Sequence, residues 1–202
     1  MAETQVAHTQ TAGMPPMLAY TIQASSSPGA WPSITIGQGS TQKGLRPNTP
    51  QDDSYWIAIL DATNPTNKVQ EFVVPGQNNA TVPSGLDQYM KSPNYLFVLV
   101  TQHLSTLHVP QGDFYDYLAL HGAGRELQRL EQLNTSLSCG SISYVTYLLT
   151  GHCGTPPQTA YEQSSTSASG YILFMMSLMP MPNGDPPYTI CDSYTFITRP
   201  TH

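Results

Sequence analysis

Three apolar segments, separated by stretches of helical character, dominate the middle of the chain. They cover residues 55–61, 94–101 and 143–150, and each is rich in the β-branched and aromatic residues that fit a pleated, buried surface. A strand, a short helix, a strand, a long helix and a strand therefore follow one another. This order predicts an α/β (α+β) domain in which two main helices pack on a small mixed sheet.

The first helix is expected over residues 84–91. Ser84 is its predicted N-cap, Asp87 stands three residues later in the capping-box position, and Pro93 ends it.

The second helix is expected to begin with Asp113 as its N-cap. The segment Gly122-Ala-Gly124 interrupts the helical period. Leu127, Leu130 and Leu133 then resume it, with charged residues on the opposite side. This spacing predicts an amphipathic surface helix after the interruption.

The first 53 residues differ in texture from the middle. Pro, Gly and Ser are dense enough here to disfavour helices. Two short strands are plausible, over residues 17–23 and 31–36, so we expect residues 1–53 to form an arm or an edge hairpin beside a core domain over residues 54–154.

The end of the chain, residues 155–202, begins with a Pro- and Ser-rich stretch that we expect to be a loop. Two strands are predicted after it, over residues 171–179 and 188–198, joined around Asn183-Gly184 as a β-hairpin. The first of them has apolar residues at nearly every position, which is typical of a buried strand. It is about half as long as a bilayer-spanning segment, so we expect no membrane insertion.

Charge is scarce in this chain. Only 10% of its 202 residues are charged, and the formal net charge is −6 with seven Lys and Arg residues that form no cluster. Nucleic acid is therefore not an expected partner. The first residues lack the positive start and apolar stretch of a secretory signal, which predicts a cytoplasmic protein or one that is exported or assembled by a signal-independent route.

The three cysteines are Cys139, Cys153 and Cys191. Their number rules out a fully paired disulfide framework, and their spacing fits no C-x2-C zinc pattern. A bridge between Cys139 and Cys153 would require the strand between them to double back. Small buried residues are the favoured interpretation, with one disulfide as the alternative.

About half of the chain, residues 55–154, resembles the interleukin-like EMT inducer domain, which also occurs in the stem region of an O-mannose N-acetylglucosaminyltransferase and in hyaluronidase-related cell-surface proteins. The matching pieces are the segment Trp56–Asp61, the Phe72-Val-Val strand, the helix at 84–91, the strand at 95–101, the helix that ends in His121-Gly-Ala-Gly124, and the strand that leads into Gly151. The family usually has an acidic residue and a glycine after its central strand, where this chain has Thr101-Gln-His103-Leu. The resemblance implies a compact α/β domain without catalytic machinery that binds carbohydrate or protein.

Candidate sites for chemistry are few. His103, His108 and Asp113 form a weak candidate for a two-His, one-carboxylate metal site; the alternative is that the two histidines are loop residues without a common direction. His121-Gly-Ala-Gly124 is similar to an esterase oxyanion loop, but no Gly-x-Ser-x-Gly elbow accompanies it. No P-loop is present either, so we expect no cofactor and no enzymatic activity.

Tyrosines outnumber phenylalanines twelve to five, a bias toward rings with a polar group. Such rings stack on sugars or anchor protein interfaces. The candidate ligand-binding residues are Trp31, Tyr89, Tyr115, Tyr117 and Tyr161; ordinary half-buried rings are the alternative.

Two functional classes follow. The first is a non-enzymatic recognition module that binds glycan or protein through a Tyr-rich, weakly charged surface. The second is a self-associating structural subunit of a larger assembly, such as a virion or a secretion apparatus, because polar segments of low charge gain order by packing their edges on a partner. An enzyme of unknown type is a third class, and it would need His, Asp and Cys side chains in one pocket.

Overall fold

The computed structural model describes residues 15–136, 143–154, 160–166, 171–181 and 188–191. The strands in this part of the chain are β1 (Leu18–Ser25), β2 (Ser33–Ile36), β3 (Lys43–Leu45), β4 (Ser54–Asp61), β5 (Lys68–Pro75), β6 (Tyr95–Gln102), β7 (Leu104–Ser105), β8 (Tyr144–His152), β9 (Ala160–Ser165), β10 (Tyr171–Pro180) and β11 (Tyr188–Cys191). The helices are α1 (Asp87–Met90), α2 (Gly112–Leu120) and α3 (Arg125–Ser136), with short 3-10 helices η1 (Gly39–Thr41), η2 (Gly76–Asn78) and η3 (Thr106–His108).

The strands join into one mixed sheet, which confirms the predicted α/β class. The order along its main path is β11-β10-β1-β6-β4-β5; β2 and β3 branch from β1, and β8 and β9 branch from β6. The long pairings are antiparallel, whereas β1 and β6 run parallel and meet through the single pair Ser25–Gln102.

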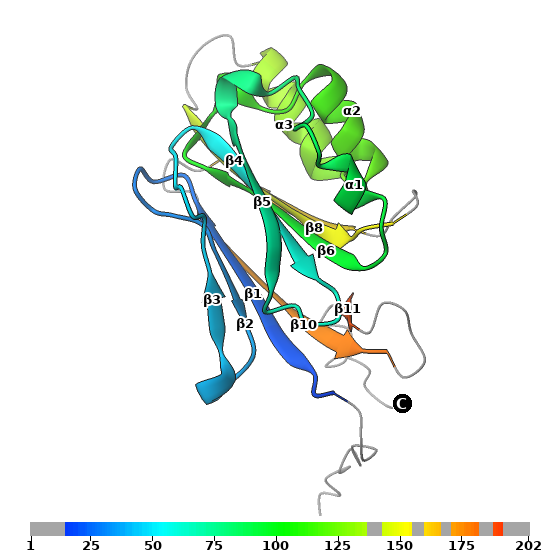
Figure 1. Ribbon diagram of the computed structural model, residues 1–202. Helices are drawn as coiled ribbons and strands as arrows, with labels where there is room; N and C mark the ends of the chain where they lie inside the picture. Colours follow the sequence, from blue (N-terminus) through cyan, green and yellow to red (C-terminus); the bar gives the residue numbers. More distant parts are fainter. Residues whose placement is uncertain (1–14, 137–142, 155–159, 167–170, 182–187, 192–202) are drawn as a thin grey trace, which may run out of the picture.

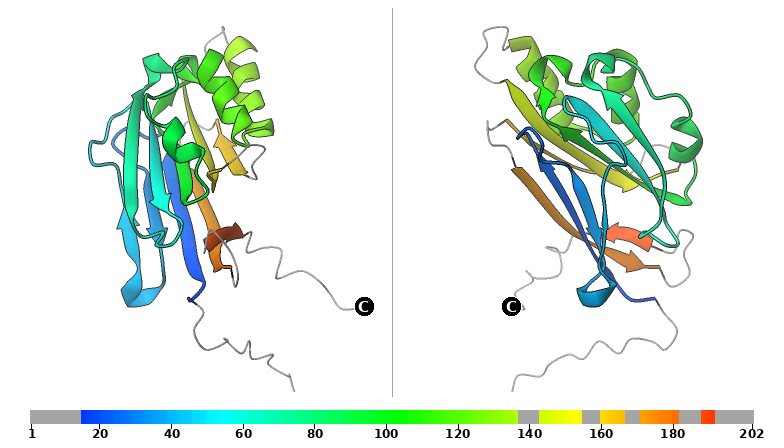
Figure 2. Two further views of the ribbon diagram at one scale, coloured as in Figure 1. Left: turned by 45° about the vertical axis from the view of Figure 1, so that its right-hand side comes forward. Right: turned by 60° about the vertical axis from the view of Figure 1, so that its left-hand side comes forward.

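β1 and β6 are paired at that one position only, so the sheet divides there into two halves that fold over each other. We call β5-β4-β6-β8-β9 the inner half-sheet and β3-β2-β1-β10-β11 the outer half-sheet. Figures 1 and 2 show the two halves as separate layers, with the three helices on the side of the inner half-sheet that faces away from β1 and β2. The fold is therefore a helix layer and two sheet layers.

Two hydrophobic cores hold these layers together. The first lies between the half-sheets and includes Tyr20 and Ile22 from β1 and Trp56 from β4. The second lies between the inner half-sheet and the helices, and includes Ile57 from β4 and Leu127 from α3. The middle strands of the inner half-sheet, β4, β6 and β8, are buried on both faces at nearly every position, which explains why their sequences are mainly apolar.

The helix expected over residues 84–91 is reduced to the four residues of α1, the expected helix after residue 112 forms as α2 and α3, and both expected N-caps are wrong. The N-cap of α1 is Leu86, with no capping side chain, because Gly85 at φ +83° turns the chain between Ser84 and the helix. The N-cap of α2 is Gln111, and Asp113 lies inside the first turn.

The first stretch of the chain forms β1, β2 and β3, which supply most of the outer half-sheet. The strands expected at 17–23 and 31–36 are present as β1 and β2. The sheet is larger than the small one expected because this stretch and the end of the chain both join it. The loop expected after residue 155 also holds β9, a strand that the sequence did not indicate.

The expected strand pair at the end of the chain is present as β10 and β11, which are antiparallel. The Asn183-Gly184 turn and residues beyond Cys191 lie outside the described residues. Cys153 and Cys191 are free thiols, and Cys139 is not among the described residues.

Candidate functional site

Three large apolar side chains project into solvent from β10. Tyr171 is 57% exposed, Leu173 is 45% exposed and Met175 is 56% exposed, while Ile172 and Met176 between them are buried. Successive side chains of a strand point to opposite faces. The three exposed side chains therefore lie on the surface of the outer half-sheet that points away from the inner half-sheet. We call this surface the outer face.

The residues beside them on the outer face are uncharged. The strand registers place Ser25 opposite Tyr171, Gln23 opposite Leu173, and Thr21 opposite Met175; Thr35, Gly44, Ser33, Ser177 and Cys191 continue these rows. The charged residue of the five strands is Lys43, which lies opposite the buried Ile36 and so belongs to the other side of the half-sheet. Within the described residues, the outer face carries no carboxylate, ammonium, guanidinium or imidazole group.

The prediction of a buried strand at 171–179 is wrong for one of its two faces. A strand with one solvated face normally alternates apolar and polar residues, and this strand has Tyr171, Leu173 and Met175 where polar residues are expected. Adjacent exposed apolar side chains on a single face are typical of interaction sites. One face of β10 therefore joins the core through Ile172, Met176 and Leu178, while the other leaves apolar side chains exposed to solvent.

The five aromatic candidates do not share a surface. Trp31 is 40% exposed and belongs to the segment between β1 and β2. Tyr161 packs on the core between the half-sheets, with its ring centroid 6.4 Å from that of Phe174. Tyr89 packs on the other core, edge-on to Phe72 and Tyr95.

The two tyrosines of α2 are engaged with different neighbours. The hydroxyl of Tyr117 donates to Oδ1 of Asp87 at 3.2 Å, and its ring centroid lies 4.5 Å from that of His121. Tyr115 is half-buried near Glu131; burial and that carboxylate raise the pKa of Tyr115. Four of the five candidate rings, those of Tyr89, Tyr115, Tyr117 and Tyr161, thus pack against one of the two cores.

The metal-site candidates are also separated. His108 pairs through Nδ1 with Oδ2 of Asp53 at 2.7 Å, and Asp113 lies in the first turn of α2. His103 stacks on Tyr144 with ring centroids 3.7 Å apart. Among the residues that the structure describes, no group of three or more His, Cys, Asp or Glu is arranged to hold a metal ion.

Asp53 organises this end of the sheet, a role that the sequence did not indicate. Its carboxylate accepts from the backbone N–H of Ser105 at 3.0 Å as well as contacting His108, and its carbonyl accepts from the N–H of Gly76 at 2.6 Å. A Cβ at Gly76 would lie 2.7 Å from Oδ1 of Asp53, so this close approach requires glycine. The His108–Asp53 pair therefore ties loops together at the start of β4.

Glu162 is a second residue that sequence reasoning missed. It belongs to β9, and its carboxylate accepts from the backbone N–H of Glu126 at 2.8 Å and of Leu127 at 3.3 Å. The hydroxyl of Tyr147 also donates to it, at 3.0 Å. The free N–H groups at the start of α3 are thus satisfied by a side chain from the inner half-sheet.

His152 and Cys153 place an imidazole and a thiol next to each other in the sequence. Burial raises the pKa of the Cys153 thiol, and its sulfur contacts the sulfur of Met90 at 3.8 Å. Burial lowers the pKa of His152, an effect that the backbone of Tyr188 partly offsets. Both groups are thus held in their neutral forms at neutral pH.

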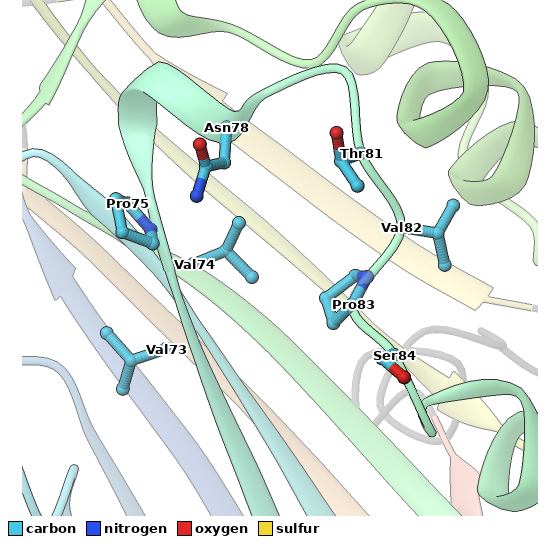
Figure 3. Close-up of a pocket in the computed structure, with 8 residues that line it drawn as sticks. All are labelled: Val73, Val74, Pro75, Asn78, Thr81, Val82, Pro83 and Ser84. Atoms are coloured by element: carbon cyan, nitrogen blue, oxygen red, sulfur yellow. The ribbon is translucent and has the colours of Figure 1, made fainter.

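A surface pocket of about 320 Å³ lies at the free edge of β5. Residues 73–75 at the end of β5 line one side together with Asn78 of η2, and residues 81–84 line the other (Figure 3). Its lining holds valines, prolines and neutral polar residues and no ionisable group. Thr81 and Ser84 contribute hydroxyl groups, with no titratable side chain among the lining residues to act on them as acid or base.

The outer face is thus the arrangement with the clearest capacity to bind, through apolar contact and neutral hydrogen bonds. In the described part of the chain, every helix is too short or too polar to cross a membrane. No protein family model matches the sequence, and no curated protein is similar enough to count as a match.

Proposed function

We propose that this protein is a non-enzymatic recognition module that binds a protein surface through its outer face. The observation that carries the proposal is the row of Tyr171, Leu173 and Met175, exposed side by side on an uncharged sheet surface. Protein interfaces are enriched in tyrosine and methionine and depleted of charge at their centres. Burying these side chains on a partner would remove apolar area from water.

The geometry favours a protein over a glycan as the ligand. A sugar-binding surface is favoured by exposed rings near one another, and the candidate rings lie on different elements, with Tyr89, Tyr117 and Tyr161 already in contact with neighbouring rings. On the outer face, Tyr171 is the aromatic residue of β10 with an exposed side chain. The resemblance to the interleukin-like EMT inducer domain implies the same broad class of activity and stays a prediction.

A structural subunit of a larger assembly is the second candidate, and the same surface favours it. Subunits of assemblies keep apolar surface exposed until they meet their neighbours. The outer half-sheet is formed by the two end regions of the chain, β1 to β3 and β10 to β11. Virion and secretion-apparatus components remain examples of this class.

The test compares proteins that co-purify with the full chain from the cells that produce it, using Leu173→Lys as the variant and Leu120→Lys as the control. Leu120 is 57% exposed on α2, away from the outer face, so its variant adds the same charge elsewhere. We expect a specific set of proteins to be lost with Leu173→Lys and kept with Leu120→Lys. If every co-purifying protein is kept by both variants, the outer face is not the binding surface.

A further inference from the structure

The outer face has the properties that a contact between identical chains requires. In a two-fold dimer the same patch lies on both sides of the contact, so a charge near the axis meets a charge of the same sign. The chain as a whole carries a formal net charge of −6 and repels its own copies. A contact through the outer face brings no like charges directly together, because this face holds no charged side chain among the described residues.

The middle of the exposed row is Leu173, with Tyr171 and Met175 on either side along β10. Gln23 and Ser33 extend the row across the half-sheet, and Ser33 already donates from Oγ to Oε1 of Gln23 at 3.2 Å. That hydrogen bond leaves fewer unsatisfied polar groups to bury. A second sheet can pack on such a surface at about 10 Å, the usual spacing of stacked sheets.

We propose that two copies of this chain pack their outer faces together, with Leu173 at the two-fold axis. This inference rests on the proposed function and names a second copy as the protein that the outer face binds. It also gives the self-association expected from the sequence a specific location.

The size of the face sets the expected strength. Its strands have between three and ten residues, which corresponds to roughly 450 Å² of sheet plane at about 3.3 Å per residue and about 4.8 Å between strands. Two copies would bury about twice that plane, plus the area of the protruding side chains. Specific interfaces begin at about 1,200 Å² of buried surface. The dimer is therefore expected to be weak and reversible, with a dissociation constant on the order of micromolar.

Light scattering on the purified full chain tests this over about 1 to 500 µM. The average mass of wild type is expected to rise with concentration from 22.0 kDa toward twice that value. Leu173→Lys and Leu173→Glu should each stay monomeric, because each places two like charges face to face at the axis. Their equimolar mixture should form the dimer again, since opposite charges then meet. That recovery also shows that both variants are folded.

Leu120→Lys is the matched control, and it should dimerise like wild type. A wild type that stays at 22.0 kDa over the whole range overturns the proposal. So does a mixture of the two Leu173 variants that remains monomeric, because the contact then does not place Leu173 against itself. A monomeric wild type combined with co-purifying proteins that depend on Leu173 would overturn the second copy and leave the proposed function intact.

Discussion

The hydroxyl of Tyr20 on β1 and the hydroxyl of Thr150 on β8 lie 2.8 Å apart in the core between the two half-sheets. Thr150 donates its single hydroxyl proton to the carbonyl oxygen of Phe97 at 2.8 Å, so Tyr20 is the donor to Thr150. Both residues are fully buried, and burial raises the pKa of Tyr20. This hydrogen bond links the outer half-sheet, which carries the proposed binding surface, to the inner one.

Removing either hydroxyl is expected to lower the free energy of unfolding by different amounts. Tyr20→Phe deletes a donor and leaves the Thr150–Phe97 bond in place, so we expect a loss of about 1 kcal/mol. Thr150→Val leaves the hydroxyl of Tyr20 and the carbonyl of Phe97 buried without that partner, so we expect a loss of about 2 to 3 kcal/mol. Urea unfolding measures both. A smaller loss for Thr150→Val than for Tyr20→Phe would contradict the donor assignment.

Glu162→Ala is expected to destabilise α3 and its contact with β9. The substitution removes the acceptor of two helix N–H groups and of the Tyr147 hydroxyl, and a loss of about 2 kcal/mol follows from capping and charged hydrogen bonds. Gln163→Ala, one residue away on an exposed position of the same strand, is the control. Equal unfolding curves for Glu162→Ala and wild type would show that this carboxylate does not hold the helix.

The folded protein is expected to lose stability below neutral pH, because His152 takes up a proton less readily in the fold than in the unfolded chain. Burial lowers its pKa in the folded protein below 6.5, so the unfolded chain binds the proton more readily. The stabilisation is fully present above about pH 6.5 and is lost as the pH falls toward the folded-state pKa. The melting temperature of wild type, measured by thermal unfolding, should therefore fall more steeply between pH 7.5 and 5.5 than that of His152→Gln. Parallel declines in the two proteins would argue against this origin.

Tyr115→Ala and Tyr117→Ala are expected to affect stability and not ligand binding. Tyr117 holds α2 to α1 through Asp87, so its loss should lower the melting temperature by several degrees. On a glycan array we expect the same pattern for wild type and both variants. A glycan signal that disappears with both substitutions would restore the sugar-binding hypothesis.

The sequence predicted the middle of the fold well because strands buried on both faces leave an unmistakable apolar signal. β4, β6 and β8 lie between two cores and match the expected segments closely. β9 was missed because its polar residues face a helix end and solvent, and the role of the half-buried Glu162 comes only from tertiary contacts with α3. Ser84 failed as a cap because the backbone turn at Gly85 cannot be inferred from the capping-box spacing.

The candidate site was the least predictable part. Tyrosine counts cannot distinguish rings that pack on Phe72 or Phe174 from rings that face solvent. The odd positions of β10 look like core in the sequence, and only the position of β10 in the outer half-sheet shows that they are exposed. An apolar strand with one uncovered face therefore has to be found from structure.

Hydroxyl-radical footprinting of the full chain at low and high concentration tests the central claim most directly, because it reports the exposure of individual side chains. We predict that labelling of Tyr171, Leu173 and Met175 falls as the concentration rises, while labelling of Leu107 and Leu120, which are exposed elsewhere, stays constant. Labelling of the three β10 residues that does not change, or that changes in step with Leu107 and Leu120, would contradict the account.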